Sequence, residues 1–395
     1  MAGLGGAGHG QFKQNPRAVL CMLKTNIHDH AVYRIRLDEL RSLVETLGLE
    51  IVGEVVQTRR RPFARYHVGS GKVKELRRYV ERHGIDIVVF YNILRSSQKL
   101  NLIRAIGCDV VDRYEVTLEI FDRMASDNLS KIQIEAARLE KLAPYFKLEA
   151  SIRYHNEKAF FRSMGEYAFH SQLRELTRRQ ARIRDQIEAL KKEKRLRIRK
   201  RRELGYPTIC ISGFYNAGKT RLFNALTGDS KPVSPLPFTT LSSKYQRRFI
   251  DHETTLLFID TIGFVIDLDP RLIQSFELNL EDIRSADLVL LLLEVTDPPF
   301  TLRLKLLEGI RLLTGIGVSR DQIIIVFNKI DLPSEPVQDL EEELGLERLG
   351  LPWTAVSAED NTNLDGLLEV ILHRLKQLEG AELPTVEEEK VATVG

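Results

Sequence analysis

The chain has 395 residues, 43% of them hydrophobic and 29% charged, so two or three globular domains fit and wholesale disorder is excluded. Lysine and arginine total 58 against 55 acidic residues, and this small net charge of +3 hides one strongly basic segment. The three cysteines, Cys21, Cys108 and Cys210, form no C-x-x-C pair, which argues against a zinc site or a disulfide framework. No apolar run approaches the ~18 residues of a membrane span. We expect a cytoplasmic protein that does not bind membranes.

The first domain is expected over residues 18–115, after a flexible lead at 1–17. Short apolar runs at 18–23, 51–56, 85–90 and 109–111 alternate with amphipathic stretches at 37–47, 73–83 and 96–106. Strands that alternate with helices and are apolar throughout predict an α/β domain with a parallel sheet.

The second expected module, residues 116–205, has no strand pattern. Apolar residues recur every three or four positions from Ile132 to Phe146 and again from Leu173 to Leu190. Two such stripes predict an antiparallel, coiled-coil-like helical hairpin, with a loop over residues 151–170.

The second helix of this hairpin is basic, with fourteen Lys or Arg against four Asp or Glu between Arg174 and Arg202. So dense a positive charge favours an anionic partner, and RNA phosphate is the usual one. A solvated face with i,i+4 ion pairs is the alternative, but acids are scarce here. The predicted RNA-binding residues are Lys191, Lys192, Lys194, Arg195, Arg197, Arg199, Lys200, Arg201 and Arg202.

A third module, residues 206–378, returns to strand–helix alternation and ends in an acidic tail, 379–395, expected to be flexible. After an apolar strand, G-x-x-x-x-G-K-T opens a helix, and this context identifies a phosphate-binding P-loop. Its backbone N–H groups surround the β-phosphate, Lys219 contacts the β- and γ-phosphates, and Thr220 offers a hydroxyl to Mg²⁺. The loop comprises Gly213, Phe214, Tyr215, Asn216, Ala217, Gly218, Lys219 and Thr220.

Further motifs in the expected order identify a guanine-nucleotide site on a six-stranded, mostly parallel sheet. Asp260 is predicted to hold Mg²⁺, Gly263 to meet the γ-phosphate, and Asp331 to accept hydrogen bonds from guanine, which adenine cannot donate. Thr240, with Thr239 as the alternative, is expected to complete the metal site. The segments are Phe238, Thr239, Thr240; Asp260, Thr261, Ile262, Gly263; Asn328, Lys329, Ile330, Asp331; and Val356, Ser357, Ala358. Hydrolysis is assigned to Lys219, Thr240 and Gly263.

Two residues depart from Ras-like enzymes. Phe264 stands where Ras has the glutamine that orients the attacking water, so we expect slow hydrolysis without a partner. Asn216 stands where potassium-activated GTPases have an asparagine that helps to hold K⁺, and a turn-forming role is the open alternative.

The sequence resembles the HflX family of ribosome-associated GTPases. The resemblance rests on GFYNAGKTRLFNALTG, PFTTL and DTIGF in the nucleotide module, and on HVGSGKVKEL, DRYEVTLEIF and KIQIEAARL before it. It covers about 360 residues. A G-P-G-E-T loop between the hairpin helices is absent, with SMGEYAF roughly in its place, and the short form resembles archaeal members.

This resemblance implies binding to the large ribosomal subunit near the peptidyl-transferase centre and separation of stalled or idle ribosomes, by a protein we expect to be a monomer. From the residues alone, an RNA-maturation or assembly GTPase and a nucleotide-gated interaction switch remain open. The Gly-rich segment at residues 67–72 could cradle a second phosphate, although a tight turn is favoured.

Overall fold

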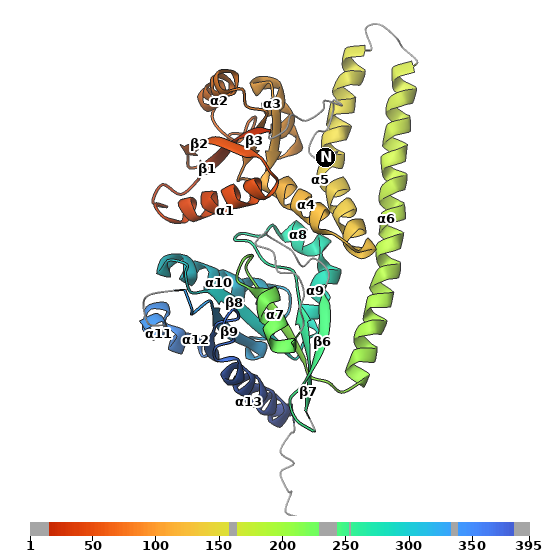
Figure 1. Ribbon diagram of the computed structural model, residues 1–395. Helices are drawn as coiled ribbons and strands as arrows, with labels where there is room; N and C mark the ends of the chain where they lie inside the picture. Colours follow the sequence, from red (N-terminus) through yellow and green to blue (C-terminus); the bar gives the residue numbers. More distant parts are fainter. Residues whose placement is uncertain (1–15, 158–163, 229–242, 253, 333–338, 383–395) are drawn as a thin grey trace, which may run out of the picture. The chain divides into compact units, whose positions relative to one another are not determined.

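The computed structural model describes residues 16–157, 164–228, 243–252, 254–332 and 339–382 (Figure 1). These residues form two compact units. The N-terminal unit contains the described part of Met1–Leu204, together with Ser243 and the segment Thr261–Asp282. The nucleotide unit contains the described part of Gly205–Pro232, Lys244–Asp260 and Ile283–Gly395. The segment after Asp260 therefore belongs with the N-terminal residues, which the sequence does not indicate.

A four-stranded parallel sheet organises the start of the N-terminal unit, as predicted. Its order is β2-β1-β3-β4, and the strands are β1 (Arg17–Lys24), β2 (Glu50–Thr58), β3 (Ile87–Phe90) and β4 (Asp109–Asp112). Every neighbouring pair is parallel. Central strand β1 is buried on both faces because its residues from Ala18 to Leu23 are apolar throughout.

Helices cover both faces of this sheet (Figure 1). One apolar core joins alternate strand residues such as Val19, Val88 and Val110 to Leu76 of α2 (Ser70–His83) and Leu102 of α3 (Ser96–Ile106). The opposite face carries α1 (Val32–Thr46) and α4 (Arg113–Met124). A reciprocal capping box begins α4, in which Asp112 accepts from the Glu115 N–H and Glu115 accepts from the Asp112 N–H. The expected boundary at residue 116 therefore falls inside a helix.

The helical hairpin is present and longer than expected. It consists of α5 (Asn128–Glu157), which contains Pro144, and α6 (Met164–Glu203). The loop predicted for residues 151–170 is wrong at both ends, because helix continues to Glu157 and resumes at Met164, and only residues 158–163 lie outside the described chain. Arg179 of α6 pairs with Glu135 of α5 at 2.5 Å, so charge as well as apolar packing joins the two helices.

Two short helices of the N-terminal unit lie in or near the segment Thr261–Asp282. They are α8 (Pro270–Ser275) and the start of α9 (Glu277–Arg284). The Phe276 ring packs edge-on against Phe121 of α4 with centroids 4.7 Å apart. Gln133 of α5 donates to the Ser275 carbonyl at 2.9 Å. This segment is therefore integrated with α4 and α5.

The nucleotide unit contains the six-stranded sheet expected of this module. Its order is β10-β9-β8-β5-β7-β6, with only β6 antiparallel. The strands are β5 (Thr208–Gly213), β6 (Lys244–Phe249), β7 (Thr255–Asp260), β8 (Leu288–Glu294), β9 (Ile323–Asn328) and β10 (Trp353–Val356). Chain order reverses beside β5, the place where open α/β sheets bind ligands at strand carboxyl ends.

Helices of the nucleotide unit are α7 (Lys219–Thr227), α10 (Pro299–Gly315), η1 (Arg320–Gln322), α11 (Asp339–Leu344), α12 (Leu346–Leu349) and α13 (Leu364–Glu382). Apolar residues of α7 and α13 pack on one sheet face. Helix α13 includes residues 379–382, which were expected to belong to the tail; residues 383–395 lie outside the described chain. In the described residues, no helix combines the length and apolarity that a membrane crossing requires.

Candidate functional site: a guanine-nucleotide site

The P-loop leaves the carboxyl end of β5 in a conformation that only particular residues allow. Gly213 has φ +141°, and a Cβ there would lie 2.3 Å from the Leu292 carbonyl oxygen. Gly218, with φ +90°, caps α7, and its Cβ would lie 2.3 Å from Asn328 Nδ2. Asn216 has φ +61°, which asparagine tolerates better than most residues. These residues allow the loop backbone to lead into the N-terminus of α7, and helix N-termini are where phosphates bind.

Lys219 and Thr220 open α7 and are both buried. Lys219 Nζ donates to the Phe214 carbonyl at 2.7 Å, across the P-loop. Burial lowers the pKa of Lys219 to about 8, while the carboxylate of Asp260 acts in the opposite direction. An ammonium group held inside the loop is placed to meet phosphate oxygens.

Asp260 ends β7 and is fully buried. Thr220 Oγ1 donates to Asp260 Oδ2 at 2.9 Å, and the sheet register pairs Ile211 of β5 with Asp260. A hydroxyl and a carboxylate at this separation are the hard oxygen ligands that Mg²⁺ prefers. The two residues therefore fit the metal site predicted for them.

The residues predicted to recognise the base come from neighbouring strand ends. Asn328 ends β9, donates from Nδ2 to the Ala217 carbonyl at 2.8 Å, and accepts from the Ala358 N–H at 3.1 Å. It thereby ties the N-K-x-D motif to both the P-loop and the Ser357–Ala358 turn. Register supports this, because Val356 pairs with Asn328.

Lys329 and Ile330 of the N-K-x-D motif also make defined contacts. Lys329 has φ +70° and its Nζ lies 2.6 Å from Glu294 Oε1. Asp331 is exposed and is therefore accessible to a bound base. Ile330 N–H donates to the Val356 carbonyl at 3.4 Å.

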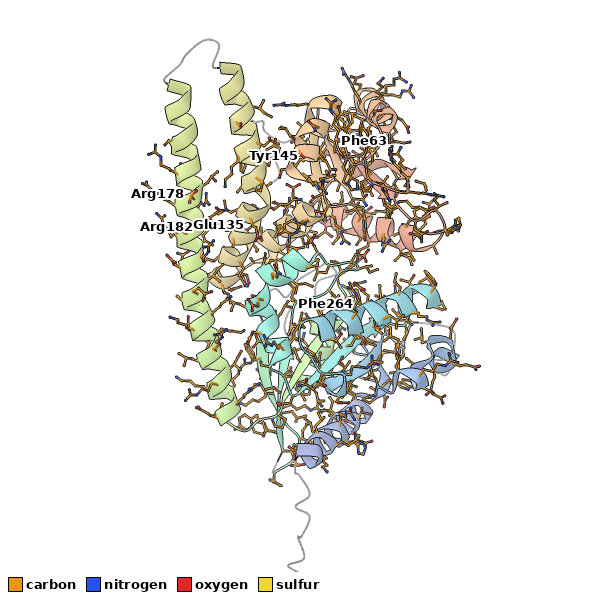
Figure 2. All side chains as sticks on the ribbon, turned by 180° about the vertical axis from the view of Figure 1, so that it is seen from behind. Phe63, Glu135, Tyr145, Arg178, Arg182 and Phe264 are labelled. Carbon is orange, nitrogen blue, oxygen red and sulfur yellow. The ribbon has the colours of Figure 1, made fainter. Side chains whose placement is uncertain are left out.

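The remaining predicted nucleotide residues do not all belong to this unit. Thr261, Ile262 and Gly263 are buried and lie in the N-terminal unit, although they follow Asp260 directly in the chain. Phe264, labelled in Figure 2, is 2% exposed. Phe238, Thr239 and Thr240 lie outside the described residues.

The predicted RNA-binding residues divide into two groups. Lys194 Nζ and Arg201 Nη2 pair with Asp282, whose side chain is fully buried, and Lys191 pairs with Glu277 at 3.1 Å. These acids come from Thr261–Asp282, far away in sequence. The scarcity of acids within the helix therefore did not show which of its cations are paired. Lys192, Arg195, Arg197, Arg199, Lys200 and Arg202 are exposed; Arg197 and Arg199 make i,i+4 pairs with Glu193 and Glu203.

The Gly-rich segment at residues 67–72 is used structurally. The Gly69 N–H, at the start of α2, donates to Gln57 Oε1 at 2.8 Å, and Lys72 pairs with Glu75 at 2.7 Å. Phe63 and His67 form a two-way backbone bridge. These contacts favour the tight turn over a second phosphate site.

Comparison with known proteins agrees with this geometry. A family model described as "GTP-binding GTPase N-terminal" matches residues 34–122, and one described as "50S ribosome-binding GTPase" matches residues 208–329. The GTPase HflX of Thermofilum pendens is 37% identical over 352 residues, which are 89% of this chain and 82% of that protein. The chain belongs to the HflX family of GTPases.

More distant members show the same extent of match. The GTPase HflX of Methanocaldococcus jannaschii is 31% identical and is matched over 87% of this chain and 83% of its own length. The Escherichia coli protein is 28% identical, over 86% and 79% respectively. Since both the N-terminal unit and the nucleotide unit fall within these alignments, this HflX-family chain binds guanine nucleotide and is a GTP hydrolase.

Proposed function

We propose that this GTPase binds the large ribosomal subunit in its GTP-bound state and separates stalled or idle ribosomes into subunits. The observation that carries the proposal is the exposed cationic face of α6, in a chain whose nucleotide module matches a family described as binding the 50S ribosome. Ribosomal RNA is the abundant polyanion that such a face would meet in the cytoplasm, where we expect the protein to act as a monomer.

The face is defined by cations that do not pair with the N-terminal unit's own buried acids. Lys192, Arg195 and Lys200 are exposed near the end of α6. Arg178 and Arg182, also exposed, lie on the side of α6 that faces away from α5 (Figure 2). The opposite side of α6 holds buried Ile183 and Ile198. One side of the helix thus packs while the other presents charge, and phosphate contacts of this kind depend strongly on salt.

The nucleotide site supplies the reaction that would drive release. Lys219 stabilises charge on the β- and γ-phosphates, and Thr220 and Asp260 would hold Mg²⁺, which neutralises charge that develops on the transferred phosphate. Gly263 N–H and the Thr240 hydroxyl are proposed to complete the site. Asn216 lies in the P-loop, three residues before Lys219, and is proposed to help hold K⁺ beside the phosphates.

The absence of a glutamine after Gly263 makes a partner necessary for fast turnover. Phe264 has no group that can hold the attacking water, so the isolated protein would hydrolyse GTP slowly. A large subunit that fixes the switch segments would supply what the chain lacks, in the way that activating partners accelerate other GTPases.

An assembly or RNA-maturation GTPase is the second candidate, because the same cationic face would bind precursor rRNA. Co-sedimentation of the protein with purified mature subunits, with GDP or a non-hydrolysable GTP analogue, separates the two. We expect the protein to pellet with large subunits, and more of it with the GTP analogue. Equal binding to large and small subunits in either nucleotide state would contradict the proposal.

A further inference from the structure

We call Gly263, the residue predicted to meet the γ-phosphate, the switch glycine. The backbone that follows it is held by side chains of the N-terminal α/β domain. The Ile266 N–H donates to Glu39 Oε1 at 2.8 Å. Arg113 Nη1 donates to the Ile266 carbonyl at 2.6 Å, and Arg113 Nη2 donates to the Asp267 carbonyl. Three backbone groups of this two-residue segment are thus satisfied by two side chains, Glu39 of α1 and Arg113 of α4.

The Asp267 side chain is held as well. Tyr91 Oη donates to Asp267 Oδ2 at 2.8 Å, and Arg36 Nε lies 2.6 Å from the same oxygen. Asp267 has φ +50°, a conformation that is costly for residues other than glycine and persists when surrounding contacts over-determine it. These contacts supply that restraint.

Arg113 is the centre of this group. Its Nη1 donates to Tyr91 Oη at 3.0 Å and lies 3.5 Å from Glu39 Oε2, and its guanidinium carbon is 4.5 Å from the Tyr91 ring centroid. The side chains of Arg113 and Glu39 are 7% and 3% exposed. We call Arg113, Glu39, Tyr91 and Arg36 the Arg113 cluster. Charged hydrogen bonds shielded from water in this way are strong and directional.

The cluster restricts the position of Gly263. Ile266 is three residues beyond Gly263, and three residues span at most about 10 Å even when fully extended. The intervening Phe264 and Val265 are 2% and 1% exposed. Because this connection is short and its side chains are packed, it cannot take up a movement of Ile266 without moving Gly263. A displacement of α4 therefore displaces the switch glycine.

The same unit carries the cationic face. Arg113 begins α4, and α5 and α6 follow it in the chain. Arg138 of α5 contacts Glu119 of α4 at 3.1 Å. Force applied to the hairpin by a bound partner thus reaches α4 through packed elements of the N-terminal unit, and reaches Gly263 through Arg113.

We propose that Arg113 is a positioning residue that couples a partner bound to the N-terminal unit to the switch glycine, so that the partner accelerates GTP hydrolysis. The inference rests on the proposed function, because the partner it names is the large ribosomal subunit. Arg113 belongs neither to the P-loop nor to the motifs predicted to recognise the base, so its loss should change the response to the partner and leave the affinity for GDP as it was.

The test compares Arg113→Met and the double variant Arg113→Met/Glu39→Gln with the wild-type chain. The double variant avoids a buried, uncompensated carboxylate, while the carbonyl oxygen of the introduced glutamine can still accept the Ile266 N–H. Matched controls are Lys99→Met and Lys99→Met/Glu115→Gln. Lys99 and Glu115 form a comparably buried pair at 2.5 Å, with side chains 12% and 9% exposed, which joins α4 to α3 rather than to the hairpin. The introduced glutamine can still take the place of Glu115 in the capping box of α4.

Three readouts are needed: stimulation of hydrolysis by isolated large subunits, co-sedimentation with those subunits, and GDP affinity. We expect the double variant to lose at least about fivefold of the stimulation while it keeps its subunit binding and its GDP affinity, and the Lys99 controls to be stimulated like the wild type. Full stimulation of the double variant, or an equal loss in the controls, would overturn the role of Arg113.

A readout without ribosomes keeps the two proposals apart. In the wild type, a GTP analogue should change amide hydrogen exchange in α1 and α4 as well as in Thr261–Asp282; in the double variant the change should be confined to the latter. If subunits do not bind or stimulate the wild type, the proposed function is wrong, and exchange alone decides: an α4 response retained by the double variant contradicts the coupling, and its loss supports it.

Discussion

Asp331 is the residue predicted to set base specificity. An ionised carboxylate only accepts, and guanine presents two adjacent donors, each such bond contributing roughly 1.5–3 kcal/mol. In Asp331→Asn one oxygen becomes a donor that faces the guanine amino group, so GTP binding should weaken by at least about 2 kcal/mol, some thirtyfold. Xanthine has an oxygen there, so the variant should prefer XTP. Competition binding with GTP, ATP and XTP measures this, and an unchanged preference for GTP in a folded variant would remove Asp331 as the base reader.

Asn216 allows a test of potassium that does not disturb the loop. Its φ of +61° is a conformation that alanine resists and glycine adopts freely, so Asn216→Gly removes the side chain and keeps the backbone. If the side chain helps to hold K⁺ beside developing phosphate charge, hydrolysis should be faster in KCl than in NaCl at equal ionic strength, and the variant should lose the difference. Equal wild-type rates in the two salts would show that Asn216 serves the turn alone.

His67 gives the N-terminal unit a dependence on pH. Burial lowers the pKa of His67, Arg95 adds to this effect, and Gln98 and Asp112 oppose it. Below pH ~6.5 the unfolded chain takes up a proton that folded His67 resists, so the free energy of unfolding should fall as the pH falls towards the folded pKa. His67 has φ +66°, which asparagine tolerates.

The comparison for this effect is urea unfolding of the wild type and His67→Asn at pH 7.5 and 5.5. We expect the variant to lose less stability on acidification, because the remaining titratable groups are common to both chains. An equal loss in the two proteins would mean that His67 titrates alike in the folded and unfolded states.

At the scale of the element, strongly apolar or glycine-marked segments were predictable. Strand β1, helix α3 and the P-loop follow from apolar runs and motif spacing. The length of the hairpin was underestimated because residues 151–157, with the sequence SIRYHNE, interrupt the apolar stripe and are mostly weak helix formers. Edge strand β6, with the polar sequence KYQRRF, is largely exposed and owes its conformation to its pairing with β7.

The candidate site divides in the same way. Residues recognised by local spacing, such as Lys219, Asp260 and Asn328, come together in the nucleotide unit. The Arg113 cluster was missed because its members are far apart in sequence. They come together only in the folded chain, where they contact Ile266 and Asp267. Arg113 itself stands in a charged stretch, DRYE, so nothing local marks it as a buried contact.

The ion pairs and exposure of the cations along α6 predict which of them contact RNA phosphate. Replacing Lys192, Arg195 and Lys200 by glutamine should reduce the salt slope of RNA binding by about 2–3, since each phosphate contact contributes roughly 0.7–0.9. Lys194→Gln removes a partner of buried Asp282 and should lower the melting temperature with little effect on the slope. Filter binding between about 50 and 200 mM salt and a thermal melt distinguish the two. A triple variant that keeps the wild-type slope would place the phosphate contacts elsewhere.

At the scale of the whole molecule, one chain contains a hydrolytic site that lacks a water-orienting side chain and a unit proposed to bind a partner. The site has a P-loop and the residues predicted to hold Mg²⁺ and to recognise the base, and Phe264 stands where Ras has its water-orienting glutamine. The N-terminal unit holds the segment that follows Gly263 and presents the cationic face of α6. Such a chain should hydrolyse GTP slowly when it is alone and faster when its partner is bound.

Single-turnover GTP hydrolysis in the presence of isolated ribosomal subunits tests this most directly. Even Ras, with its glutamine, hydrolyses GTP at only about 10⁻⁴ s⁻¹ unaided, and this chain alone should be no faster than that order. Large subunits should raise the rate at least about tenfold, and small subunits at the same concentration should not. A fast intrinsic rate that large subunits leave unchanged would contradict the account.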